Sequence, residues 1–158
     1  MTATTLDLPL GLPGPRRAAF AAPSGRASPP PPIAAPTARS ALVLMRQAAD
    51  GLAEAHRESD PLQRYPLAYL AALRAAAAVL AVRTMPRPRR GSTRNVWHLL
   101  AVVAPELAEW AAFFASCSDI RAAAEAGIAR LVGQRDADDL LRQAEQFVGL
   151  VGTVVPLR

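Results

Sequence analysis

Residues 96–114 read VWHLLAVVAPELAEWAAFF, and the spacing of their apolar side chains decides the fold class. Six side chains recur at steps of 4, 3, 4, 3 and 4, the period of one face of an α-helix: Val96, Leu100, Val103, Leu107, Trp110 and Phe114. Pro105 lies inside the run but off this face, so we expect a bend near Val103. Ser92 or Thr93 is the expected N-cap. Trp97 lies beside the stripe, where it either widens the buried face, which we favour, or meets a second subunit.

Two helical segments are expected before this one. The first starts near Thr37 or Ser40 and fades near Ser59, with a stripe formed by Ala41, Met45, Ala48, Leu52 and Ala55. The second opens at Asp60-Pro61, an N-cap followed by a proline in the first turn, and its stripe comprises Leu62, Tyr65, Tyr69, Leu73, Ala76 and Leu80. Because Pro66 lies inside it, the helix either begins anew there or kinks.

Two further segments follow the central run. The fourth, over residues 119–132, is expected to turn four side chains inward: Ile120, Ala124, Ile128 and Leu131. The fifth starts at Asp136, and its stripe comprises Leu140, Ala144, Phe147 and Val151. Asp136, Asp138 and Asp139 gather near the positive end of its dipole, where capping explains them better than a cation site does.

Helices joined by short links favour antiparallel packing. The sequence therefore predicts an all-α domain over residues 37–155, built as a four- to five-helix up-and-down bundle. Residues 1–36 differ in composition, since they are rich in proline and alanine and include the run Pro29-Pro30-Pro31-Pro32. Such a stretch buries too little apolar surface to offset the entropy of ordering, so we expect a disordered N-terminal tail.

Positive charge is concentrated in one place. The chain carries a formal net charge of +5, and residues 83–98, RTMPRPRRGSTRNVWH, hold five arginines and no acid: Arg83, Arg87, Arg89, Arg90 and Arg94. A basic patch on an otherwise balanced surface suits a phosphate or an acidic partner. The alternative is a solvated link between two helices.

Several classes of protein are disfavoured. Cys117 is the only cysteine, so no internal disulfide or cysteine-based zinc site can form, and a buried inert thiol is expected. No phosphate-binding glycine loop or metal-ligand spacing occurs, so we expect neither a cofactor nor a metal. The most apolar stretch, Tyr69 to Val82, is interrupted by Arg74 and is too short to span a bilayer, and no secretory signal is evident. We therefore expect no membrane partner and a cytoplasmic location.

The stretch Arg94-Asn95-Val96-Trp97-His98 carries the candidate chemistry. If the helix has begun by Arg94, Arg94 and His98 share one face as residues i and i+4. A histidine moves protons near neutral pH, and a neighbouring guanidinium stabilises a phosphate, so the pair suits metal-independent RNA cleavage. The same pair also suits a polar helix face with no catalytic role.

Three stretches resemble an actinobacterial, divergent branch of the HEPN superfamily: RYPLAYLAALRAAAAVLAVR, RNVWHLLAVVAPELAEWAAFFAS and DADDLLRQAEQFVGLV. The resemblance covers roughly residues 38–152 and implies a helical bundle that forms a homodimer. Active members share a signature of arginine, a polar residue and histidine that forms a composite RNase site across the dimer. In this chain Arg94 would match the arginine, Asn95 the polar residue and His98 the histidine.

The spacing departs from that signature. The family has four to six residues between arginine and histidine, whereas three separate Arg94 from His98 and seven separate Arg90 from it. One hypothesis is therefore a dimeric, non-catalytic or degenerate HEPN module that binds nucleic acid, RNA favoured, or a protein partner through the Arg83–Arg94 patch. A second is an endoribonuclease with His98 as general acid/base and Arg94 on the scissile phosphate. A third is a helical protein-interaction module without a nucleic-acid role.

Overall fold

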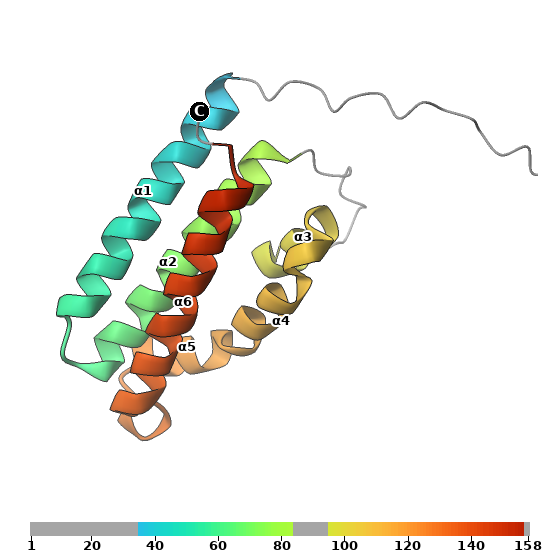
Figure 1. The fold of residues 1–158 in the computed structure, drawn as a ribbon. Helices are drawn as coiled ribbons and strands as arrows, with labels where there is room; N and C mark the ends of the chain where they lie inside the picture. Colours follow the sequence, from blue (N-terminus) through green and yellow to red (C-terminus); the bar gives the residue numbers. More distant parts are fainter. Residues whose placement is uncertain (1–34, 84–94, 157–158) are drawn as a thin grey trace, which may run out of the picture. The chain divides into compact units, whose positions relative to one another are not determined.

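The computed structural model describes residues 35–83 and 95–156, and within them every regular element is helical. Figure 1 shows three long helices, α1 (Ala35–Arg57), α2 (Pro61–Val82) and α6 (Gln134–Val154). The connection between α2 and α6 contains α3 (Val96–Val103), α4 (Ala108–Ser116), α5 (Ser118–Glu125) and two 3₁₀ turns, Pro105–Leu107 and Ala129–Leu131. The all-α prediction is confirmed.

The three long helices and α4 run alternately up and down: in Figure 1, α1 descends, α2 ascends, α4 descends and α6 ascends. Helix α3 runs in the same direction as α2, because Trp97 near its start contacts Tyr69 in the middle of α2, and Val103 at its end accepts a hydrogen bond from Arg83 at the end of α2. The predicted tail, residues 1–36, lies outside the described residues except for Ala35 and Pro36, which begin α1. The helix therefore starts before Thr37 and Ser40, and the expected start near one of these two residues is wrong. The predicted apolar face of α1 is correct, with four members buried and Leu52 half-buried.

Helix α2 lies at the centre of the bundle and packs against α1, α3, α5 and α6. Asp60 is its N-cap as predicted, accepting a hydrogen bond from the Leu62 amide, and the helix continues through Pro66. Small side chains let its neighbours approach closely, since a Cβ added at Gly51 on α1 would lie 3.5 Å from the Ala71 Cβ. By length and composition alone α2 could cross a membrane, contrary to the estimate from Tyr69–Val82, but half of its apolar window is buried in the bundle.

An aromatic cluster fills the core where α2, α3, α4 and α6 meet. The Trp97 ring lies 5.1 Å from that of Phe114, and Phe114 lies 5.3 Å from Phe147, between ring centroids. Trp97 is 3 % exposed, and its indole Nε1 donates a 2.7 Å hydrogen bond to the Tyr69 hydroxyl. The preferred core position of Trp97 is therefore confirmed. The predicted α6 stripe is also buried as expected.

The central run of residues 96–114 breaks instead of bending. The α-helix stops at Val103, and Pro105 opens a 3₁₀ turn from which α4 restarts at Ala108. The buried face then steps by 3, 4, 3, 4 and 3, through Trp97, Leu100, Ala104, Leu107, Ala111 and Phe114. Three predicted members, Val96, Val103 and Trp110, are only half-buried. The N-cap is Asn95, so the expectation of Ser92 or Thr93 is wrong.

The fourth predicted helix is shorter than expected. Helix α5 ends at Glu125, and Gly127 has a φ of +77°, the left-handed conformation that closes a helix. The Gly127 amide donates to the Ala124 carbonyl, and the Ile128 amide donates to the Ala123 carbonyl, the two hydrogen bonds of a Schellman motif. Only Ala124 is buried as predicted. Three side chains expected inside are exposed: Ile120, Ile128 and Leu131.

Candidate functional site

The first end of the arginine-rich segment is fixed by Arg83, the C-cap of α2. Its guanidinium donates a 3.2 Å hydrogen bond to the Val103 carbonyl and forms an ion pair with Glu106. The hydrogen bond from Arg83 lowers the pKa of the Glu106 carboxyl below its ordinary value. Arg83 therefore ties the end of α2 to the α3–α4 break, and its charge is already matched within the bundle.

The second end is fixed by Asn95, whose side-chain oxygen accepts a 2.9 Å hydrogen bond from the Trp97 amide. This contact uses the predicted polar residue of the signature as a helix cap. His98 follows in the first turn of α3 and is exposed, and the described residues make no hydrogen bond or ion pair with its ring. Helix α3 begins at Val96, so the described helix does not include both Arg94 and His98.

Four of the predicted arginines, Arg87, Arg89, Arg90 and Arg94, lie outside the described residues. Of the described site residues, Arg83 contacts the end of α3 and the turn that follows it, whereas Asn95 caps the start of α3, so the two lie at opposite ends of this helix. The expected juxtaposition of Arg94 with His98 stays a prediction.

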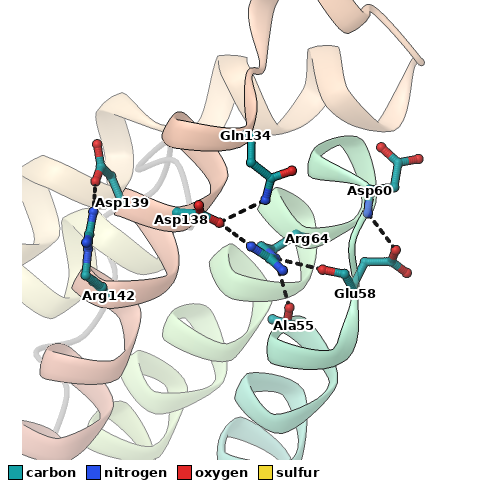
Figure 2. Close-up of polar contacts among 8 residues, drawn as sticks. All are labelled: Ala55, Glu58, Asp60, Arg64, Gln134, Asp138, Asp139 and Arg142. Carbon is teal, nitrogen blue, oxygen red and sulfur yellow. Dashed lines mark hydrogen bonds and ion pairs between the residues drawn. The ribbon is translucent and has the colours of Figure 1, made fainter.

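A second polar cluster, absent from the sequence-based predictions, joins α1, α2 and α6 (Figure 2). Arg64 Nε donates to the carbonyl oxygens of Ala55, at 3.1 Å, and Glu58, at 2.8 Å, at the end of α1. Its Nη1 forms an ion pair with Asp138 on α6, and the Gln134 side chain donates to the same carboxylate at 3.0 Å. The Arg64 side chain is only 16 % exposed.

Beside this cluster lies a hollow of about 290 Å³ between α1, α2 and α6, lined by His56, Arg64, Asp138, Leu141, Arg142 and Glu145. The His56 ring contacts the Glu145 carboxylate, and Arg142 pairs with Asp139 (Figure 2 shows the latter). Both guanidinium groups in the hollow thus have an acidic partner. The arrangement stabilises helix packing and leaves no unpaired guanidinium there for a phosphate.

The sequence held no local signal for this cluster, because Arg64 and Asp138 are 74 positions apart and only tertiary packing brings them together. The three neighbouring aspartates of α6 have ordinary structural roles. Asp136 accepts a 2.9 Å hydrogen bond from the Gly133 amide, as predicted for a capping residue, and Asp138 and Asp139 pair with arginines. Among the described residues, no three metal-ligating side chains come together.

Cys117 is 8 % exposed, in agreement with the predicted buried thiol. The buried Tyr65 hydroxyl lies within hydrogen-bonding reach of it. Burial raises the pKa of Tyr65 well above its ordinary value, and a hydrogen bond with Cys117 raises it further. Both residues line a hollow of about 330 Å³ with Phe113 and Ile120 at its apolar side.

The fold is thus a helical bundle around α2. The Arg64 cluster joins the first turns of α2 to α1 and α6, and Arg83 joins its end to the turn after α3. The HEPN_SAV_6107-like HEPN family model matches residues 55–152, and the chain belongs to this HEPN family. The match runs from the end of α1 to the last turn of α6, and so includes both ends of the arginine-rich segment. Comparisons with curated proteins and with solved structures gave no match.

Proposed function

We propose that this chain is a non-catalytic HEPN module that binds nucleic acid, with RNA favoured, through residues 83–94. The observation that carries the proposal is the density of positive charge between two anchored helix ends: five arginines and no acid. Since Arg83 is engaged by Glu106, the four arginines at positions 87, 89, 90 and 94 are the phosphate-binding groups in this proposal.

The contacts of the signature residues favour binding over cleavage. Asn95 is used as a helix cap, and no arginine or carboxylate among the described residues contacts His98. A general acid/base that cleaves RNA needs a cation close enough to stabilise the phosphate charge that develops. The spacing of three residues between Arg94 and His98 is also shorter than that of the active HEPN signature.

The test is fluorescence anisotropy with a labelled single-stranded RNA at increasing NaCl concentrations. Four phosphate contacts predict that affinity falls by about 50-fold between 50 and 200 mM salt, because each contact releases condensed counterions. Replacing the four arginines with glutamine (R87Q/R89Q/R90Q/R94Q) should abolish most of this salt dependence.

The matched control replaces four exposed arginines elsewhere, R46Q/R57Q/R130Q/R135Q, and changes the net charge equally. This control should keep both the affinity and the salt slope of the original chain. Equal losses in both variants would show that only net charge matters, and a salt-independent affinity would exclude phosphate binding. Capture of a protein partner that survives nuclease treatment, without RNA binding, would favour the protein-interaction alternative.

The endoribonuclease alternative predicts a different result. It requires metal-independent cleavage of structured RNA in EDTA, lost on His98→Ala while RNA binding persists. Our proposal predicts no cleavage above a protein-free control by either form. If the original chain cleaves RNA and His98→Ala does not, the non-catalytic proposal is rejected and the endoribonuclease hypothesis is supported.

A further inference from the structure

A hollow of about 310 Å³ lies between α2 and α5, and none of the residues that line it belongs to the segment 83–94. Helix α2 contributes four apolar side chains, Leu62, Pro66, Leu67 and Leu70, at spacings that place them on one side of the helix, together with the polar Gln63 at the edge of this wall. Helix α5 contributes Arg121 and Glu125, one turn apart. An apolar wall therefore faces a cation and an anion across a space the size of a small ligand.

The guanidinium of Arg121 is held in place by the core. Its Cζ lies 4.9 Å from the centroid of the Tyr69 ring, a cation–π contact with a side chain that is 4 % exposed. Tyr69 is fixed in turn by the 2.7 Å hydrogen bond from Trp97. The cation in the hollow is thus pre-oriented by buried aromatic residues and does not depend on a ligand for its position.

The hydrogen-bonding capacity of Arg121 is largely unused within the described residues. Its buried Nε has no acceptor there, and the Nη1–Glu125 Oε1 distance of 3.9 Å is too long for a hydrogen bond. Pro66 has no N–H, so the carbonyl of Leu62 also lacks its usual donor four residues on. The hollow therefore holds a cationic donor on one side, and acidic and carbonyl acceptors on residues that line the same space.

We propose that this hollow binds a small zwitterion with an apolar body, of the class of apolar α-amino acids. The ligand carboxylate accepts hydrogen bonds from the Arg121 guanidinium, and its ammonium donates to Glu125 and the Leu62 carbonyl. Its side chain packs on Pro66, Leu67 and Leu70. Two close ion pairs replace the single long contact between Arg121 and Glu125. This proposal does not depend on RNA binding.

The test measures binding of L-leucine to the full chain by isothermal titration calorimetry. Two probes each remove one charge: N-acetyl-L-leucine lacks the ammonium and L-leucinamide lacks the carboxylate. Leucine should bind at least about tenfold more tightly than either probe, because each loses a charge-assisted contact. No saturable leucine binding, or equal binding of N-acetyl-L-leucine, would overturn the proposal.

Two variants assign the contacts. Arg121→Gln should remove leucine binding, and Arg130→Gln, an exposed arginine nine residues on, should leave it unchanged. Glu125→Gln, at a half-exposed side chain, should lower the affinity for leucine and leave the affinity for N-acetyl-L-leucine unchanged or higher. A general loss of stability would lower both affinities and would not change the preference between the two ligands. Leucine affinity unchanged in both Arg121→Gln and Glu125→Gln would place the ligand elsewhere and reject this site.

Discussion

Arg64 shows how one side chain can join three helices. It bonds two carbonyls at the end of α1, belongs to α2, and pairs with Asp138 on α6. The last carbonyls of a helix have no partner within the helix, so a guanidinium placed there supplies the missing donors. The cluster in Figure 2 therefore stabilises the packing of α1, α2 and α6.

Replacing Arg64 should be costly. We expect Arg64→Met to lower the free energy of unfolding by about 1–3 kcal/mol, because it leaves part-buried carbonyls and Asp138 without their donor. Arg135→Met is the control, since the Arg135 side chain is 94 % exposed and its ion pair is long, so the expected change is within about 0.5 kcal/mol. Urea unfolding measures both, and equal changes in the two variants would contradict this role for Arg64.

The raised pKa of Tyr65 predicts that the protein loses stability at high pH. Its pKa is raised in the folded state, so the unfolded chain releases the phenol proton first, near the ordinary value of 10.0. The stabilisation is fully present below pH 10 and declines as pH rises above it. Because the chain has no lysine, few other groups titrate in this range. Unfolding measured from pH 8 to 11.5 should show this decline, and Tyr65→Phe should flatten it. An equally steep decline in Tyr65→Phe would refute the assignment.

At the scale of elements, the chain changes direction where a residue prevents the helix from continuing. Pro105 cannot donate to a carbonyl one turn earlier, and α3 stops just before it. Gly127 adopts a positive φ that lets the chain leave α5 with its last carbonyls bonded. These two residues set where α3 and α5 end.

Two glycine substitutions with opposite expected signs test this account. Gly127→Ala should destabilise the protein by about 1–2 kcal/mol, because a Cβ strains the left-handed conformation although nothing lies within 4 Å of it. Gly149→Ala, in the interior of α6 with equally open surroundings, should stabilise it by about 0.5–1 kcal/mol. Thermal unfolding of the two variants measures both effects. If Gly127→Ala leaves the stability unchanged, backbone strain at this position is rejected as the reason for the glycine.

At the scale of the whole molecule, the bundle places its large apolar side chains unevenly. Trp97, Phe114 and Phe147 are buried together, while Val102 and Phe113 are 49 % and 38 % exposed. Scattered exposed apolar residues are normal for a monomer, but apolar surface near α4 also suits contact with a second subunit. Homodimerisation, implied by the family resemblance, therefore remains our proposal for this chain.

Light scattering after size-exclusion chromatography tests the dimer. We expect a mass of about twice the 16.7 kDa of one chain, with dissociation only on dilution. A mass of one chain over the whole concentration range would reject it. A composite site with two copies of His98 would then also be excluded, whereas RNA binding by residues 83–94 of a single chain would not.

The sequence by itself determined the helical class, the approximate position of each segment, the Asp60 cap and the buried face of α6. These depend on the backbone period and on contacts between neighbours along the chain. Only the tertiary structure decided that Val96, Val103 and Trp110 are half-buried, that Ile120 is exposed, and that Arg64 meets Asp138. The physical reason is that the helical period of 3.6 residues locates the apolar face of a helix to within about one residue, whereas the packing of the other helices decides which residues beside that face are buried.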